Sequence, residues 1–234
     1  MKIIKAADRH FSDFGWLQTY WLFSFSNYYD PHNVQLGALR VFNDDIVKPE
    51  GGFATHPHEE MEIITIVLQG EITHEDSMGN KAVIKAGDVQ RMSAGTGLTH
   101  SEYNLAKKAV SFYQIWILPD TAGLEPTYAQ KTYDAKQWKN TLLPVASGQD
   151  IPGAVSFHTD ATIYRCQLGV GKEVVHDSAD GRCVFLYLTE GSLLVNGQEV
   201  SARDQVRVEK AETLVIKAQD LADFMLIDVP GSGD

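Results

Sequence analysis

The fold is decided by residues 51–70, which read GGFATHPHEEMEIITIVLQG. Two glycines come first, then two histidines separated by a proline, and then an apolar run rich in β-branched residues that ends at Gly70. Such runs between glycine-containing turns are typical of short strands. Because side chains two residues apart point to the same face of a strand, His56 and His58 are predicted to face one point. Pro57 has no amide hydrogen to donate, which favours a strand start or a sheet edge.

A second pair of potential ligands lies 44 positions after His56, in His100-Ser101-Glu102. Glycines at positions 95 and 97 precede it and permit tight turns that bring strand ends together. Three imidazoles and one carboxylate suit a divalent transition metal such as iron, nickel, copper, manganese or zinc. The predicted metal ligands are therefore His56, His58, His100 and Glu102. The alternative is a set of ordinary turn histidines, and the repeated i, i+2 spacing argues against it.

Two further groups compete for a place near this site. Glu62 has the same strand parity as His56 and His58, but Glu102 is preferred as the ligand because it shares a strand with His100. Glu62 is then expected either to hydrogen-bond to a ligand or to be an ion-paired residue at a strand end. His74 and Asp76 form another i, i+2 pair beside Met78-Gly79-Asn80, where turn-forming or surface residues are expected.

The composition limits the class of protein. Apolar residues make up 44% of the 234 residues, which predicts a substantial core. The net charge of −11 argues against electrostatic binding of nucleic acid. The sequence has neither an apolar run long enough for a membrane span nor a secretory signal at its polar start, so a cytoplasmic location is expected. Cys166 and Cys183 are expected to be buried, reduced thiols.

Strand signals dominate the whole chain. Short runs rich in β-branched and aromatic residues, such as residues 110–118 and 184–188, alternate with glycine-containing turns. Asn196-Gly197 between two apolar segments is a strong hairpin signal. Many short strands of this kind predict a sandwich or a barrel. Helical periodicity is weak, and one short helix is possible over Asp134–Leu142.

A faint internal repeat divides the chain in two. Residues 68–89 and residues 188–205 both read as strand, glycine turn, hairpin and strand, with Gly70 corresponding to Gly191. The sequence therefore predicts an all-β protein of two tandem antiparallel barrels. We expect an N-terminal metal-binding barrel over residues 1–125, a connector over 126–153 and a C-terminal barrel over 154–234. His176 has no partner histidine, so the second barrel is expected to lack a metal.

The two ligand motifs resemble those of the cupin superfamily. The first matches as His56-x-His58-x3-Glu62 followed by Gly70, and the second as Gly87, then Gly97-x2-His100-x3-Asn104. Two departures are Ser93, where a proline is usual, and a slightly shifted glycine before His56. More specifically, the chain resembles the pirin family, nearest its bacterial members, in FSNYYDP (25–31), LRVFNDD (39–45), FATHPHEEME (53–62), HEDSMG (74–79), MSAGTGLTHSE (92–102) and QIWILP (114–119). The likeness covers most of residues 1–125 and weakens beyond them.

This resemblance implies a bicupin of two jelly-roll-type barrels with few short helices and a single metal in the first. It also implies flavonol 2,3-dioxygenase (quercetinase) activity, in which a flavonol and O2 react and carbon monoxide is released. Fe(II) is the favoured metal, with Cu, Ni, Mn or Zn possible. In this hypothesis Glu102 also accepts a proton from the substrate as general base.

A flat aromatic substrate needs an apolar slot. Phe53, Phe112 and Trp116 are candidate walls, with Gln114 nearby, although a place in the barrel core is an equally good interpretation of the aromatics. The aromatic cluster of Trp16, Trp21 and Phe23 is expected to pack between the barrels.

Three rival functions stay open at this stage. The first is an iron-containing regulatory or redox-sensing protein that acts through a protein partner, as the resemblance to animal pirins implies. The second is another metal-dependent enzyme, such as an isomerase or a different oxygenase. The third is a metal-free sugar-binding or storage cupin, and the complete ligand set argues against it.

Overall fold

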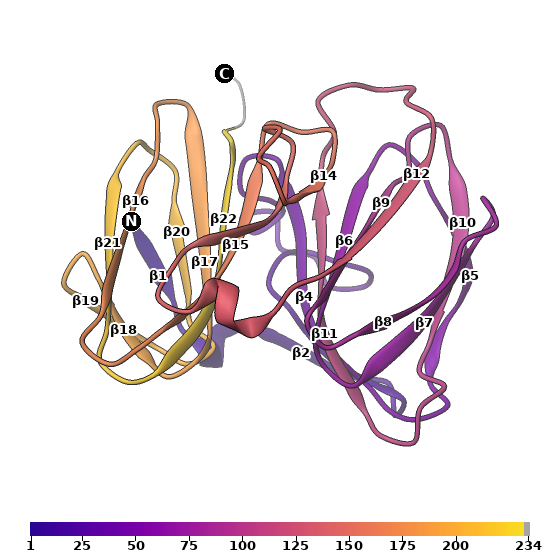
Figure 1. Ribbon diagram of the computed structural model, residues 1–234, viewed down its shortest axis with the longest axis horizontal. Coiled ribbons are helices and arrows are strands. Elements are labelled where there is room, and N and C mark those ends of the chain that lie inside the picture. Colours follow the sequence, from indigo (N-terminus) through magenta and orange to yellow (C-terminus); the bar gives the residue numbers. More distant parts are fainter. Residues whose placement is uncertain (232–234) are drawn as a thin grey trace.

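Two barrels built from strands lie side by side in the computed structural model, which describes residues 1–231 (Figure 1). Each barrel combines a seven-stranded sheet with a four-stranded sheet. The all-β bicupin architecture predicted from the sequence is confirmed. No helix within residues 1–231 has the length and apolarity that a membrane span requires.

The first barrel joins a sheet of order β12-β9-β6-β11-β4-β3-β2 to a sheet of order β5-β10-β7-β8. The strands of the larger sheet are β2 (His10–Asp13), β3 (Leu17–Trp21), β4 (Leu39–Val47), β6 (Glu62–Gln69), β9 (Asp88–Ser93), β11 (Val110–Ile117) and β12 (Thr127–Thr132). Those of the smaller sheet are β5 (Gly52–His58), β7 (Glu71–Asp76), β8 (Lys81–Lys85) and β10 (Leu98–Tyr103).

The second barrel repeats this plan with sheets of order β1-β20-β17-β22-β15-β13-β14 and β16-β21-β18-β19. Its larger sheet contains β1 (Lys2–Ile4), β13 (Leu143–Ser147), β14 (Val155–Ser156), β15 (Thr162–Leu168), β17 (Arg182–Glu190), β20 (Gln205–Val208) and β22 (Ala222–Pro230). Its smaller sheet contains β16 (Glu173–Asp177), β18 (Ser192–Val195), β19 (Gln198–Ser201) and β21 (Thr213–Ala218).

The repeat seen in the sequence corresponds to the same turn in both barrels. Gly70 joins β6 to β7 and Gly191 joins β17 to β18, with φ angles of 79° and 86°. A Cβ atom would lie 2.9 Å from the carbonyl oxygen of Ala109 in the first case and 2.2 Å from that of Leu221 in the second. Only glycine combines this left-handed backbone with so close an approach.

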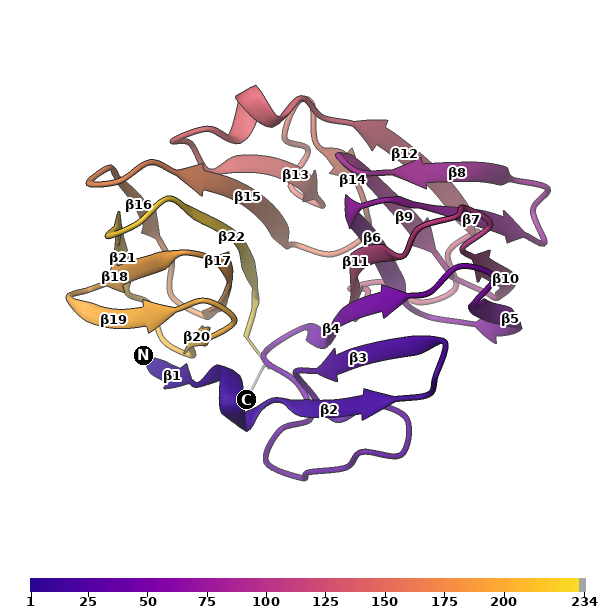
Figure 2. The same ribbon diagram turned by 90° about the horizontal axis from the view of Figure 1, so that it is seen from below.

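Strands cross the predicted domain limits. β1, at the start of the chain, pairs with β20 of the second barrel, as Figure 2 shows. The segment predicted as a connector, residues 126–153, contains β12, which pairs with β9, and β13, which pairs with β15.

The two helices are single 3-10 turns. The helix predicted over Asp134–Leu142 is shorter in the structure, η2 at Ala135–Trp138, and η1 spans Ala6–Asp8. The side chain of Asp134 accepts a hydrogen bond from the amide of Lys136, and the side chain of Gln137 bonds back to the Asp134 amide. This capping box fixes the start of a turn in a segment with weak helical periodicity.

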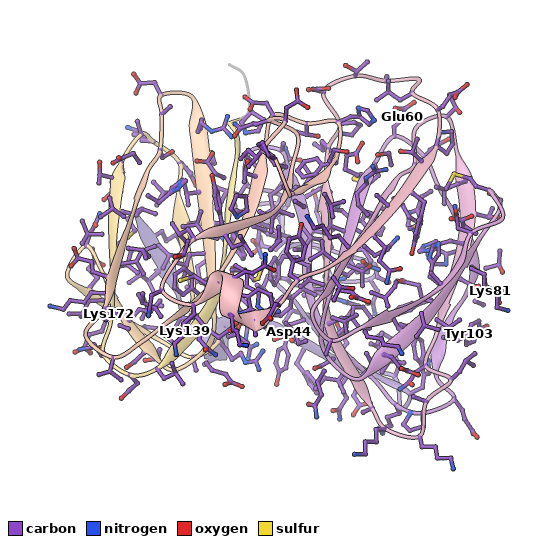
Figure 3. The ribbon with its side chains drawn as sticks, in the orientation of Figure 1. Asp44, Glu60, Lys81, Tyr103, Lys139 and Lys172 are labelled. Carbon is purple, nitrogen blue, oxygen red and sulfur yellow. The ribbon has the colours of Figure 1, made fainter. Side chains whose placement is uncertain are left out.

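The largest hydrophobic cluster lies between the barrels and draws on both of them. Phe42 of the first barrel packs against Phe185 of the second with ring centroids 5.1 Å apart. Beside this contact, Asp44 lies near the boundary of the barrels (Figure 3) and accepts hydrogen bonds of 2.7 Å from the Tyr187 hydroxyl and from Arg203 Nη1. Strands of the larger sheets are therefore buried on both faces, which explains apolar runs such as that of β6.

Candidate metal centre

The two histidine motifs lie on neighbouring antiparallel strands. β5 pairs with β10, with His56 opposite His100 and His58 opposite Leu98. β5 is the edge strand of its sheet, so the missing amide hydrogen of Pro57 is tolerated there. The i, i+2 spacing and the pairing together bring His56, His58 and His100 to one place.

A local irregularity sets the position of Glu102. The register of β10 against β5 shifts between His100 and Glu102, so Glu102 lies opposite Phe53. Bulges of this kind re-aim side chains beside functional sites. The strands also approach closely at Gly52, where a Cβ atom would lie 2.4 Å from the Glu102 carbonyl oxygen.

The three imidazoles converge tightly. One ring nitrogen from each of His56, His58 and His100 lies within 4.8 Å of the others, and the Nε2 atoms of His56 and His100 are 3.1 Å apart. The Nδ1 atom of His56 lies 2.7 Å from the carbonyl oxygen of Ala54. A carbonyl can only accept, so Nδ1 carries the proton and Nε2 of a neutral His56 presents a lone pair.

The same reasoning fixes the tautomer of His100 through His74. His74 Nε2 lies 3.1 Å from a carboxylate oxygen of Asp76 and donates a hydrogen bond to it. A neutral His74 then has its lone pair on Nδ1, which faces His100 Nδ1 at 3.5 Å and accepts from it. His100 Nε2 therefore presents a lone pair as well. Two lone pairs that face one another at 3.1 Å repel, and a cation between the imidazoles relieves this repulsion.

Burial keeps the imidazoles of His58 and His100 uncharged. It lowers the pKa of His58 to about 4 and that of His100 to about 2, and the neighbouring His56 adds to both shifts. Neutral imidazole is the form that binds metals. Three neutral imidazoles and a nearby carboxylate therefore fit a divalent transition metal.

Glu102 is the buried carboxylate of the site, with 1% of its surface exposed. Its Oε2 accepts a 2.9 Å hydrogen bond from Gln114 Nε2, and the Thr65 hydroxyl donates to Gln114 Oε1 at 2.8 Å. Burial raises the pKa of Glu102 to about 7, although the hydrogen bonds from Gln114 and Thr65 oppose this. A ligand atom of Glu102 lies within 4.8 Å of both His100 and His74.

The structure corrects the expectation for His74. It is fully buried rather than at the surface, because β7 pairs with β10 and places His74 directly opposite Glu102. Its ring stacks on Tyr128 with centroids 5.1 Å apart. Asp76 does form the expected turn, since its Oδ1 accepts from the amides of Met78 and Asn80. Burial works to raise the pKa of Asp76, but hydrogen bonds from His74 and Asn80 outweigh it and hold the pKa below its usual value.

A cavity of about 560 Å³ opens beside these residues inside the first barrel. Of the predicted pocket residues, Phe53, Gln114 and Trp116 line it. Trp16 and Trp21 also line it rather than packing between the barrels, whereas Phe23 does pack against Phe185 of the second barrel. The remaining lining residues are Phe14, Leu17, Phe25, Ser26, Asn43, Asp45, Gly52, Ala54, His56, His58 and Glu102.

Two predicted residues lie elsewhere. Phe112 is fully buried in a hydrophobic cluster with Val67 and Ile72 and does not reach the cavity. Glu62 accepts a 2.7 Å hydrogen bond from Ser93 Oγ and belongs to neither group of potential metal ligands. Its strand parity with His58 is lost because β5 ends at His58 and β6 begins at Glu62, with a left-handed residue, Glu60, between them.

Sequence reasoning missed Asn43 and Asp45. They lie on β4 within Leu39–Val47, a strand that is otherwise largely apolar. Three consecutive polar residues in the middle of such a strand, Asn43-Asp44-Asp45, are the signal that indicates a functional role for this segment.

The second barrel contains a different buried group. His176 Nε2 lies 2.7 Å from Asp228 Oδ2, and Arg182 also bonds to Asp228. Within the described part of the chain, both groups of potential metal ligands lie in the first barrel. β21, the counterpart of β10, contains neither histidine nor carboxylate.

Known protein families match both halves of the chain. The family model for Pirin matches residues 5–117, and that for the quercetinase C-terminal cupin domain matches residues 144–229. Over 227 residues the chain is 40% identical to quercetin 2,3-dioxygenase of Escherichia coli K12, with 97% of each chain covered. It is also 40% identical to a pirin-like protein of Caulobacter vibrioides over 218 residues, which cover 93% of this chain and 94% of that one.

Solved structures agree with this likeness. The crystal structure of YhhW from Escherichia coli matches with a TM-score of 0.94 and 39% identity, and the match covers 100% of this chain and 99% of that one. A structure of the bacterial pirin YhhW in complex with nickel(II) matches with a TM-score of 0.93 and 38% identity, over 98% and 99% of the two chains. This protein therefore belongs to the pirin family of bicupins and resembles the bacterial quercetin 2,3-dioxygenases.

Proposed function

We propose that this chain is a metal-dependent dioxygenase that cleaves flavonols such as quercetin with O2 and releases carbon monoxide. The observation that carries the proposal is the convergence of the His56 and His100 lone pairs at 3.1 Å, at the side of an aromatic cavity. His56, His58, His100 and Glu102 would hold the metal. The active unit is the first barrel, to which β12 also belongs, and the second barrel, which includes β1 and β13, is its metal-free copy.

Fe(II) is the favoured metal, with Ni, Cu, Mn and Zn as alternatives. Nitrogen-rich sites accept several of these ions, so the supply in the cell contributes to the choice. Support for nickel comes from the structural relative described as a nickel(II) complex. When bound, the metal supplies a Lewis acid that lowers the pKa of the flavonol 3-hydroxyl and couples the substrate to O2.

Glu102 acts as the base in this proposal. Burial raises its pKa to about 7 in the metal-free protein, and proton transfer is efficient when the pKa of the base lies near neutral pH. Gln114 donates to one carboxylate oxygen of Glu102 and fixes its orientation, while the hydroxyl of Thr65 holds Gln114 in turn. The carboxylate accepts the proton of the substrate 3-hydroxyl and leaves an electron-rich flavonolate.

The aromatic walls bind and orient the flat substrate. Trp16 and Phe53 meet edge to face with centroids 5.0 Å apart, and Trp116 contacts Phe25 in the same way at 5.2 Å. These side chains exclude water from the flavonolate, which prevents its reprotonation before it reacts.

The test is oxygen uptake and carbon monoxide release by the Fe(II)-loaded protein with quercetin. We expect both signals in the unmodified protein and their loss in His56→Ala. His32→Ala removes an exposed histidine that does not line the cavity and should retain full turnover. Glu102→Gln should lower the turnover number per bound metal ion by at least ten-fold.

These measurements distinguish the dioxygenase from an iron-containing regulatory protein. Full turnover in Glu102→Gln would rule out the role of Glu102 as base. Absence of oxygen uptake with Fe(II) and with each of the alternative metals, in protein that binds them stoichiometrically, would exclude the dioxygenase. An iron-containing regulatory protein that acts through a protein partner would then be the better assignment.

A further inference from the structure

We propose that Asn43 and Asp45 form a second recognition site in the cavity, which binds hydroxyl groups of the substrate other than the 3-hydroxyl. This inference rests on the proposed function for the class of ligand, a polyhydroxylated aromatic. Its basis is a pair of buried polar side chains that line the cavity and whose Oδ1 atoms have no hydrogen-bond partner.

The position of the pair follows from strand register. On β4, Asn43 lies opposite Gln114 of β11 and Trp21 of β3. Asp45 lies two residues further along and therefore points to the same face of the sheet. Both residues line the cavity that contains His56, His58 and Glu102. They are 4% and 3% exposed, so the fold itself covers them.

Their oxygen atoms lack hydrogen bonds. Within residues 1–231, neither Oδ1 of Asn43 nor Oδ1 of Asp45 has a hydrogen-bond partner. A buried polar group in this state costs about 1–3 kcal/mol of stability. The neighbouring Gln114 and Glu102 are paired with each other. The indole Nε1 of Trp116, which also lines the cavity, is the further buried polar atom without a partner there. Buried unsatisfied groups that line a binding cavity indicate a role in binding.

The charge of Asp45 suits a neutral ligand. Burial is the main cause that raises its pKa to about 8, and the negative charges of Asp44 and Glu102 reinforce the shift. At neutral pH the side chain is therefore mostly an uncharged carboxylic acid, which can both donate and accept a hydrogen bond. Asp45 belongs to neither group of potential metal ligands among the described residues, so a second metal is not the explanation.

The surroundings select an aromatic ligand with hydroxyl groups. Six aromatic side chains line the cavity, and its volume of about 560 Å³ lies within the range of small-molecule sites. Phenolic hydroxyls donate to amide and carboxyl oxygens. A site built to hydrogen-bond a hydroxyl discriminates strongly against the analogue that lacks it, because its own polar groups then stay unpaired.

The experiment compares two ligands under nitrogen, where no oxygen-dependent cleavage consumes them. Quercetin carries several ring hydroxyls, whereas 3-hydroxyflavone has only the 3-hydroxyl and the 4-carbonyl. Binding to the Ni(II)-loaded protein is followed by quenching of the fluorescence of Trp16, Trp21 and Trp116, which line the cavity. Asp45→Leu and Asn43→Leu should each weaken quercetin binding by about ten-fold and change 3-hydroxyflavone binding by less than about two-fold.

Two variants complete the design. Asp45→Asn preserves the shape of the side chain and one acceptor oxygen, so a smaller loss of about three-fold is expected for quercetin alone. Asp180→Leu removes an exposed carboxylate of the second barrel and should leave both affinities unchanged. The proposal would be overturned if Asp45→Leu weakened the binding of quercetin and of 3-hydroxyflavone equally. It would also be overturned if the ratio of the two affinities stayed unchanged in all cavity variants.

Failure of this inference is distinct from failure of the dioxygenase assignment. The affinity ratio is measured without O2 and is repeated on the metal-free protein. A ratio that depends on Asp45, in a protein that shows no oxygen uptake, supports the hydroxyl site and rejects the dioxygenase. Oxygen uptake by a protein whose affinity ratio does not change in the Asn43 and Asp45 variants supports the dioxygenase and rejects the hydroxyl site.

Discussion

Asp44 and Asp45 are consecutive residues of β4 whose carboxylates lie on opposite faces of one sheet. Asp44 bonds to Tyr187 and Arg203 between the barrels, whereas Asp45 lines the cavity without a partner for its Oδ1. Two neighbouring aspartates therefore have different roles. Asp44 joins the two barrels, and Asp45 keeps a buried oxygen atom available to a ligand.

The ionic contact of Asp44 is expected to stabilise the association of the barrels. Asp44→Asn leaves Arg203 and Arg9 without their buried anion, and loss of one partner of a buried ion pair costs about 3–5 kcal/mol. Arg203 is partly exposed, which favours the lower end of that range. Urea denaturation measures the change in unfolding free energy. The matched control is Asp160→Asn, whose pair with Arg182 is 60% exposed on the aspartate side and should cost less than about 1 kcal/mol.

The unpaired Asp45 should make stability depend on pH. Its pKa is raised from 3.8 to about 8 in the fold, mainly by burial. Between these values the folded protein holds a proton that the unfolded chain has released, so stability falls as pH rises. The fall is about 1.4 kcal/mol per pH unit. Over the two units from pH 5 to pH 7, Asp45→Asn should therefore gain about 3 kcal/mol relative to the unmodified protein. Thermal unfolding across this range tests the slope, and parallel curves for the two proteins would contradict it.

Metal binding should stabilise the fold by mass action. At a free metal concentration 100 times the dissociation constant, the gain is about 2.7 kcal/mol, which corresponds to roughly 5–10 °C in melting temperature for a chain of this length. His58→Ala should abolish most of this shift, and the exposed His32→Ala should preserve it. The measurement is a melting curve with and without Ni(II), followed by chelation to reverse the effect. An equal shift in both variants would place the metal elsewhere.

His74 is expected to tune the metal site without being required as a ligand. His74→Phe keeps the stack on Tyr128 but removes the acceptor for His100 Nδ1. Loss of such a partner typically lowers metal affinity 10–100-fold. Competition with a chromophoric chelator measures the affinity. Tyr128→Phe, which loses only a hydrogen bond to Gln130, is the control and should change the affinity by less than three-fold. A similar drop in both variants would indicate general loosening of the barrel.

Gly52 should tolerate no side chain. The Cβ of alanine would lie 2.4 Å from the Glu102 carbonyl oxygen and 2.4 Å from a Tyr103 ring carbon, so β5 must move away from β10. We expect Gly52→Ala to cost about 1–3 kcal/mol and to weaken metal binding together with stability. Gly169→Ala meets only the flexible side chains of Asn140 and Lys172 and serves as the control. Unfolding curves with and without metal separate the two effects.

The sequence predicts the ligand strands well because two local rules suffice for them. The i, i+2 spacing of His56 and His58 needs only strand geometry, and the placement of His100 needs only pairing of β5 with β10. His74 escaped prediction because its burial depends on the pairing of β7 with the other side of β10. Glu62 was assigned by parity across His58, and a chain reversal between β5 and β6 breaks that parity.

The cavity was harder to predict than the ligands. Trp16 lines the cavity, whereas Phe112 packs into a hydrophobic cluster with Val67 and Ile72. Which of the two borders the cavity depends on the packing of strands that are distant in the sequence. Asn43 and Asp45 broke the apolar pattern of β4. This departure from the apolar pattern is the sequence feature that indicates their proposed role in binding.

The pairing of β1 with β20 has a consequence for how the chain folds on the ribosome. Lys2 pairs with Arg207, so β1 has no partner until about 200 further residues have been synthesised. At 5–20 residues per second, this delay is roughly 10–40 s. The strands of the first barrel are all synthesised well before β20, whereas β1 stays unpaired until β20 has been made. Synthesis of the second barrel as a separate fragment would leave β20 exposed, with a bare edge prone to pair with another molecule.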